Sequence, residues 1–546
     1  MWSQTYQLFG LSPGSSALVA AFPIVVVLVL LGVFRRPAWI AAVSGLAATF
    51  LLACVAFGMP IPLAVAAAGY GVGFGLFPIS WIVFSALLLF RISTETGQFH
   101  ILRDSIGGLT ADPRLQALLI AFAFGAFLEG AAGFGTPVAI AAAMLTGLGF
   151  SPFRAAAICL LANTAPVAFG SIGIPIVTLA GTTGLPLLRL SAAVGKICAP
   201  VALLLPAYLI LAIGGWRSLR SVWLPACLAG GVYAVVQTVV SSYFGPQLTD
   251  ILAAIAAVAV LILYLRFSRG KVCDKAEAER FRGEGGRASA SADVVAHTTS
   301  DVVRAWMPYG LLVVTVLLWG VRPIHDFLER ATVVFPWPML HDQVVRLAPV
   351  VTKASPYHAF YTLNTLSAAG TACFVAALAS AALLGVSAKR LVACIATVLK
   401  QMSLPTLTVT AVLAMAFLMN YSGATATLGI AFAATGVVFP FFSAILGWIG
   451  VFLTGSDTSA NALFGNLQVV TAEHLGLNPV WTAAANSVGG VMGKMISLQT
   501  IAVAAAATGM STADQSRLFR FTLRHSVLLA VLTGCIALVC TYYLAA

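Results

Sequence analysis

Charged residues are scarce in this sequence. Asp, Glu, Lys and Arg make up 8% of its 546 residues, whereas hydrophobic residues make up 60%. A soluble domain usually carries about 25% charged residues, so a chain this apolar could not cover a water-facing surface with polar groups. We therefore expect an integral membrane protein whose main partner is the lipid bilayer.

Acidic residues are scarcer than basic ones, at 17 against 29, which gives a formal net charge of +12. In a soluble protein this excess would suggest a nucleic-acid partner. Here the Lys and Arg residues cluster between apolar runs, as they do in the cytoplasmic loops of membrane proteins. We therefore expect no nucleic-acid partner.

Paired cysteines and enzyme motifs are also missing. The nine cysteines form no CxxC pair and most stand within apolar runs, which indicates buried side chains rather than a metal site or disulfides. The sequence has no HExxH, no GxSxG and no GxGxxG after a strand. A glycine-rich stretch before Lys494 is one residue too short for a nucleotide-binding loop. We expect no enzyme activity, no cofactor and no metal ion.

Long apolar runs are abundant. A membrane-spanning helix needs about 20 residues, so the length allows about 12 to 14 spans. Continuous runs of this kind are typical of helices rather than of barrel strands. We predict an all-α polytopic membrane protein with two related halves, at residues 1–266 and 305–546. A cytoplasmic linker, 267–304, joins them, and an external loop lies near 321–357.

An internal similarity supports the two halves. The run "FLEGAAGFGTPVAI" starts at Phe127, and "FLTGSDTSANALFG" starts at Phe452. Pro152 and Pro479 follow at nearly the same offsets. Duplicated halves with broken or re-entrant helices at corresponding positions are typical of secondary transporters, with the binding site where the halves meet. The loop charges leave open whether the halves are parallel or inverted.

Two acidic residues, Glu129 and Asp457, stand within these broken segments. A carboxylate at membrane depth is costly unless it is paired, wetted or protonated, and burial favours its protonated form. Both are therefore candidate proton-coupling residues. Alternatively, Glu129 is a neutral structural acid bonded to a neighbouring helix. Asp457 could instead cap the following helix or ligate Na⁺.

Polar residues in the same segments are candidates for binding a small carboxylate. Gly and Pro interrupt the helices, and a half-helix N-terminus offers free N–H groups to an anion. Asn, Ser, Thr and Gln add hydrogen-bonding groups without charge. Lys494 needs a counter-charge, which Glu129, Asp457 or the substrate could supply, unless it extends to a helix end. The candidates are Gly133, Gly135, Thr136, Asn163, Thr164, Ser171, Ser456, Ser459, Asn461, Lys494 and Gln499.

Four strings carry a family resemblance: "FLEGAAGFGTPVAI", "ANTAPVAFGSIGIPI", "GVFLTGSDTSANALFGNLQ" and "NSVGGVMGKMIS". They closely resemble the lactate permease family of bacterial transporters, and the resemblance covers nearly the whole chain. One departure is Leu498, where the family's "GKMISPQ" has Pro. The resemblance implies an inner-membrane importer of L-lactate, D-lactate and glycolate, coupled to proton entry. Sodium-coupled carboxylate symport and a membrane sensor of hydroxy acids are the alternatives.

Overall fold

The computed structural model describes residues 1–34, 36–133, 136–267, 275–283, 297–351 and 353–544, apart from the side chains at 136, 275–276 and 512–513. Within these residues, 10 helices are long and apolar enough to cross a membrane, or up to 12 if each of two bent pairs is one span. The predicted all-α polytopic fold is confirmed. Residues 268–274 and 284–296 of the predicted linker lie outside the described part of the chain.

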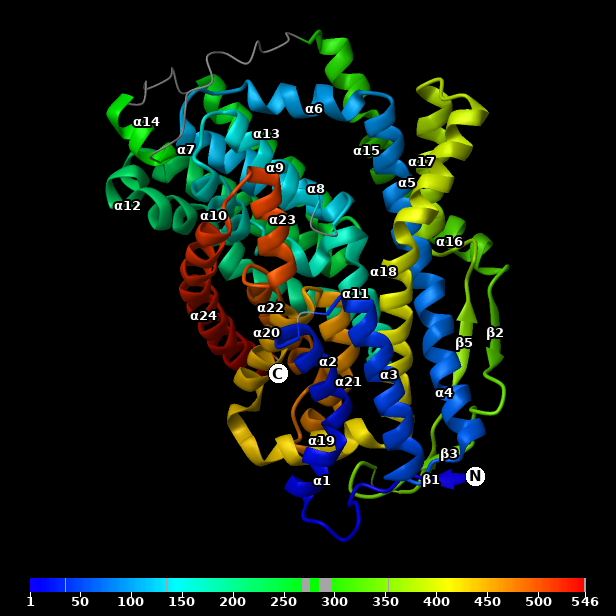
Figure 1. Cartoon of the computed structure of the whole chain (residues 1–546). Coiled ribbons are helices and arrows are strands. Elements are labelled where there is room, and N and C mark those ends of the chain that lie inside the picture. The colour runs from blue at the N-terminus through cyan, green and yellow to red at the C-terminus, as the bar shows by residue number, and fades with distance from the viewer. Residues whose placement is uncertain (35, 134–135, 268–274, 284–296, 352, 545–546) are drawn as a thin grey trace.

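The first part of the chain is almost entirely helical (Figure 1). Its longest helix, α12, carries non-helical backbone at Gly215, with φ 75° and ψ −175°, so it consists of two helices in succession. Glycine adopts this conformation without the steric cost that a Cβ would add. The helices are α1 (Pro13–Ala20), α2 (Phe22–Gly32), α3 (Ala38–Val55), α4 (Ile61–Phe74), the π-helical turn η1 (Gly75–Ser80), α5 (Trp81–Glu95), α6 (Gln98–Gly107), α7 (Pro113–Gln116), η2 (Ala117–Phe124), α8 (Gly125–Ala131), α9 (Thr136–Gly147), α10 (Pro152–Ala162), η3 (Val167–Phe169), α11 (Gly170–Thr183), α12 (Leu187–Tyr243), α13 (Thr249–Phe267) and α14 (Lys275–Arg282).

The second part adds short strands to its helices. The strand β1 (Trp2–Ser3) at the N-terminus pairs in parallel with β3 (Val344–Arg346), which also pairs antiparallel with β4 (Ser355–Pro356). A separate antiparallel pair joins β2 (Val333–Pro336) to β5 (Phe360–Leu363). The helices are α15 (Thr299–Gly320), α16 (Arg322–Glu329), α17 (Ala369–Leu383), α18 (Ala388–Ser422), α19 (Ala424–Phe432), η4 (Ala433–Val438), α20 (Phe439–Thr454), α21 (Asp457–His474), α22 (Pro479–Lys494), α23 (Leu498–Thr508) and α24 (Thr512–Tyr543).

The two similar sequence segments fold into similar units. In the first, α8 and α9 form a hairpin, and α10 and α11 form a span bent by 67°. In the second, α20 and α21 form a hairpin, and α22 and α23 form an interrupted span. Pro152 and Pro479 occupy the first position of α10 and α22, where proline is favoured because its missing N–H has no helical acceptor. Figure 1 shows the first hairpin in the upper half of the molecule and the second in the lower half.

Backbone chemistry explains where the helices of these units stop. Gly455 ends α20 in the left-handed conformation, with φ 72°, as glycine commonly does at a helix C-terminus. Ser456 then caps α21, because its side chain accepts from the N–H of Ser459. Ser497 caps α23 in the same way through the N–H of Thr500. The sequence thus contains a stop signal and a start signal at each of these two interruptions.

Candidate functional site

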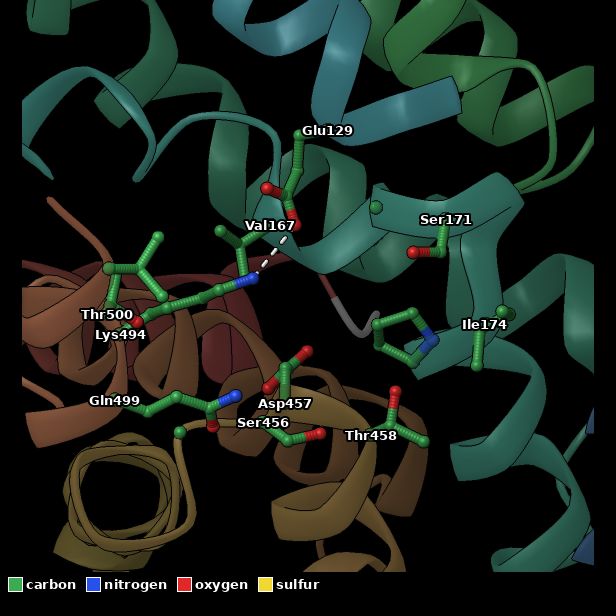
Figure 2. A pocket seen from close by; sticks show the side chains of 14 residues that line it. Glu129, Val167, Ser171, Ile174, Ser456, Asp457, Thr458, Lys494, Gln499 and Thr500 are labelled. Atoms are coloured by element: carbon green, nitrogen blue, oxygen red, sulfur yellow. Dashed lines mark hydrogen bonds and ion pairs between the residues drawn. The ribbon is translucent and has the colours of Figure 1, made fainter. Parts of the chain in front are cut away.

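The breaks between α8 and α9, α10 and α11, α20 and α21, and α22 and α23 meet at one cavity. Glu129 comes from the end of α8, and a second group comes from the bend between α10 and α11. The two breaks of the second unit supply the rest (Figure 2). The lining residues are Glu129, Val167, Gly170, Ser171, Ile174, Pro175, Gly455, Ser456, Asp457, Thr458, Lys494, Gln499, Thr500 and Val503.

A buried ion pair joins the two units across this cavity. The Nζ of Lys494 donates to Oε1 of Glu129 at 2.8 Å, and the side chains are 11% and 3% exposed. The other carboxylate oxygen, Oε2, has no hydrogen-bond partner among the described residues. The side chain of Lys494 therefore turns into the cavity and does not extend toward the membrane surface. Its counter-charge in this structure is Glu129.

The Glu129 carboxylate packs against Gly170, where a larger residue would clash with it. A Cβ added at Gly170 would lie 2.8 Å from Oε1 of Glu129 and 3.1 Å from its Cγ. Contacts this short require the carboxylate or the backbone to move. The absence of a side chain at the start of α11 therefore lets Glu129 reach Lys494.

Asp457 lies across the cavity from the ion pair (Figure 2) and is 3% exposed. Its Oδ2 accepts from the Ser487 hydroxyl at 2.8 Å and from the Asn461 amide at 3.3 Å. Its Oδ1 has no partner among the described residues. The cap of α21 is Ser456, so capping does not account for Asp457.

Asn461 begins a row of buried amides behind Asp457. Its Oδ1 accepts from the Asn486 amide at 3.0 Å, and Oδ1 of Asn486 accepts from the Gln468 amide at 3.1 Å. Asn461 also donates to the Pro175 carbonyl at 3.2 Å, which links α21 to the bent span of the first unit. This network orients Asp457 and does not itself line the cavity.

Backbone in the left-handed region marks the bend of the first unit. Ser171 has φ 48° and Ile172 has φ 59°, and Gly173 continues at φ 75°. Two successive non-glycine residues in this region each cost roughly 1–3 kcal/mol, and such strain concentrates at functional sites. The Ser171 hydroxyl points toward the cavity (Figure 2) and donates to the Ala132 carbonyl at 3.3 Å. It therefore joins the bend to the tip of the α8–α9 hairpin.

Helix N-termini supply positive potential to the same cavity. The helices α21 and α23 begin at Asp457 and Leu498, and residues of both first turns line the wall. The first N–H groups of a helix have no acceptor within it, and the helix dipole favours an anion there. The cavity can therefore hold a small carboxylate between an ammonium group and two helix ends.

The structure separates the predicted site residues into two groups. Those lining the cavity are Glu129, Ser171, Ser456, Asp457, Lys494 and Gln499. Those lying outside its lining are Gly133, Asn163, Thr164, Ser459 and Asn461. The Thr164 hydroxyl, for example, donates to the Leu161 carbonyl at 2.6 Å. Gly135 and the side chain of Thr136 lie outside the described residues.

Thr458, Thr500 and Asp250 were not predicted. Thr458 and Thr500 line the cavity. Each stands in a short polar run, beside Asp457 or Ser497, and this position in the sequence could have predicted them. Asp250 begins the apolar run of α13 and is 1% exposed. An acid in the first turn of a helix usually lies near a surface. The residues around Asp250 in the sequence therefore do not predict that it is buried.

Comparison with known proteins places this architecture in a family. The model of the family described as L-lactate permease matches residues 16–544. The chain belongs to the L-lactate permease family. The glycolate permease of Escherichia coli strain K12 is 44% identical over 99% of this chain and 98% of its own. The L-lactate permease of Bacillus subtilis strain 168 is 42% identical over 97% of each chain. That of E. coli K12 is 40% identical over 100% and 99%.

Membership of the L-lactate permease family agrees with the long apolar helices. Together they make the chain a multi-pass transport protein of the bacterial inner membrane. The cavity lies where the broken helices of its two units meet, which is the usual place of a binding site in secondary transporters.

Proposed function

We propose that this permease imports lactate and related small 2-hydroxymonocarboxylates, namely L-lactate, D-lactate and glycolate, together with protons and without altering them chemically. The Glu129–Lys494 ion pair inside a cavity bounded by four helix interruptions carries the proposal. The names of the relatives, lactate and glycolate permeases, support the choice of substrate.

Competition for one ammonium group would couple the anion to the proton. Lys494 is the one cationic residue among the lining residues that the structure describes. A substrate carboxylate beside ionised Glu129 would place two negative charges on this single ammonium. Ionised Glu129 therefore opposes substrate binding, whereas protonated Glu129 releases the ammonium. Proton binding at Glu129 thus favours substrate binding at Lys494.

Charge conservation supports the same scheme. In the empty site, the Glu129 carboxylate and the Lys494 ammonium sum to zero. In the loaded site, neutral Glu129, the Lys494 ammonium and the substrate anion also sum to zero. Moving a net charge against a membrane potential costs roughly 2.3 kcal/mol per 100 mV. An anion that enters with one proton avoids this cost.

The remaining polar groups suit a small hydroxy acid. The N-termini of α21 and α23 would hold the substrate carboxylate beside Lys494. The hydroxyls of Ser171 and Thr458 and the amide of Gln499 line the cavity and can both donate to and accept from a 2-hydroxyl group. Apolar contact with the methyl group of lactate would come from Val167, Ile174 and Val503, which also line the wall.

Asp457 supports one alternative, sodium coupling. Its Oδ1 lacks a partner among the described residues, and the hydroxyls of Ser456 and Thr458 line the wall beside it. Carboxylate and hydroxyl oxygens are hard ligands that suit a hard cation. Under the main proposal, Asp457 is instead a second proton-coupling residue.

Uptake of labelled L-lactate into proteoliposomes tests the proposal. With an inward proton gradient and no sodium, we expect accumulation that a protonophore abolishes. Glu129→Gln should remove this accumulation, and Asp326→Asn, the same chemical change at a side chain that is 77% exposed, should leave it intact. Uptake that requires sodium would overturn the proton-coupling assignment. Uptake of neither lactate nor glycolate would overturn the substrate assignment.

A further inference from the structure

A third buried acid lies next to the site but outside its cavity. Asp250, in the first turn of α13, is 1% exposed. The hydroxyl of Tyr233, which is 0% exposed, donates to its Oδ1 at 3.0 Å. Its Oδ2 has no partner among the described residues. No cation forms an ion pair with Asp250 in the part of the chain that the structure describes.

Asp250 packs directly against the residue that follows Glu129. A Cβ added at Gly130 would lie 2.8 Å from the Cβ of Asp250 and 3.2 Å from the backbone nitrogen of Ile251. Glycine at position 130 therefore permits α13 to touch α8. The carboxyl groups of Asp250 and Glu129 repel each other when both are ionised.

Among the described residues, the titratable groups that interact with Asp250 are an acid, a tyrosine and a cysteine. The elements packed against α13 are α8, η2, α11 and α12. From these, Glu129 of α8 and Tyr233 and Cys198 of α12 interact with Asp250, while η2 and α11 carry no titratable side chain. The ammonium of Lys494 is paired with Glu129, and that of Lys196 on α12 lies 5.9 Å from the centre of the Trp481 ring. An ionised Asp250 beside an ionised Glu129 would add a second buried negative charge that has no cation of its own among the described residues, which is strongly unfavourable.

We propose that Asp250 is a further proton-binding residue of the permease and passes its proton to Glu129. The inference rests on the proposed function, since it concerns how the coupling proton reaches Glu129. Asp250 holds a proton while Glu129 is ionised and paired. Oδ2 of Asp250 and Oε2 of Glu129 do not bond to each other, so the proton passes through a bridging water. When substrate approaches Lys494, the O–H bond of Asp250 breaks and an O–H bond forms on Oε2 of Glu129. The negative charge moves to Asp250, which then takes up another proton from water.

The position of Asp250 separates the path of the proton from that of the substrate. Asp250 does not line the substrate cavity; it contacts α8 at Gly130, one residue after Glu129. Loss of Asp250 should therefore impair net proton movement more than substrate binding.

Comparison of exchange with net uptake tests the relay. Exchange of labelled for unlabelled lactate across proteoliposomes at equal pH requires the loaded protein to cross the membrane, but requires no net proton release. For Asp250→Asn, we expect exchange within about twofold of wild type. We expect proton-driven uptake to fall by about 100-fold, the scale of a positioned proton-transfer group. Asp326→Asn, an exposed acid-to-amide change, is the matched control and should leave both rates unchanged.

Wild-type proton-driven uptake in Asp250→Asn would overturn the relay and leave the proposed function intact. Absence of proton-driven uptake in the wild-type protein would overturn the proposed function itself. If Asp250→Asn loses exchange as well, the Tyr233→Phe variant tests the relay instead. It keeps the carboxyl group of Asp250 and removes only the hydroxyl that donates to it. The pH profile of net uptake should then shift while exchange persists, and an unshifted profile would overturn the proposal.

Discussion

The Glu129–Lys494 pair can be tested by a double-mutant cycle on stability. Its Nζ and Oε1 are 2.8 Å apart, and both side chains are at least 89% buried. Glu129→Gln leaves a buried ammonium without a counter-charge, and Lys494→Met leaves a buried carboxylate. Removal of one partner from such a pair costs about 3–5 kcal/mol. Replacement of both by neutral side chains of similar volume is often nearly neutral.

The double variant should therefore be more stable than either single variant. If each single change costs about 3–5 kcal/mol and the double change costs less than about 3 kcal/mol, the coupling free energy exceeds about 3 kcal/mol. The free energy of unfolding would be measured from denaturant titrations of the purified protein in detergent micelles. Additive losses in the double variant would show that the pair is not a coupled unit.

Lactate itself provides a sharper contrast between the two single variants. In Glu129→Gln the substrate carboxylate can supply the missing negative charge, so lactate at 100 times its Kd should stabilise the protein by about 2.7 kcal/mol. In Lys494→Met the ammonium that would bind the carboxylate is gone, and lactate should stabilise little. Equal stabilisation of both variants would refute the placement of the substrate at Lys494. Chloride at the same concentration is the control for a non-specific anion effect.

Three further outcomes follow from individual residues. Asp457→Asn should abolish proton-driven lactate accumulation and preserve lactate-induced thermal stabilisation, which uptake and melting measurements would show. Gly170→Ala should cost about 1–3 kcal/mol of unfolding free energy, because the added Cβ would lie 2.8 Å from Oε1 of Glu129. Leu498→Pro should stabilise the protein by about 0.4–1 kcal/mol in the same titration. Leu498 is the first residue of α23, and Ser497 before it has φ −62° and ψ 137°, which suits a residue preceding proline.

Much of the site could be predicted from local sequence. Glycine and serine at residues 455 and 456 stop one helix and start the next, and such signals operate within a few residues. The similarity between the runs from Phe127 and Phe452 then indicated that both broken segments share one site. Acids and a lysine within apolar runs had to be enclosed or paired, which identified Glu129, Asp457 and Lys494.

Other features depend on contacts that no local pattern encodes. Asn163 and Thr164 share a polar run with Ser171, yet the 67° bend between α10 and α11 leaves only Ser171 on the cavity wall. Local sequence does not state the direction of such a bend. Asp250 is buried because Gly130, 120 positions earlier, lets α13 approach α8. A pattern confined to neighbouring residues could not reveal this contact.

The costs built into this region are best explained by ligand binding. A buried ion pair is often no more stable than apolar side chains of the same volume, and left-handed backbone at Ser171 and Ile172 adds strain. The first turns of α21 and α23 also begin with N–H groups that have no acceptor within the helix, although the side chains of Ser456 and Ser497 accept from those of Ser459 and Thr500. These unfavourable features face one cavity, and an anion bound there would satisfy the free N–H groups and the ammonium together. Selection for stability alone would not favour such features, so binding of a substrate anion is the simplest explanation for them.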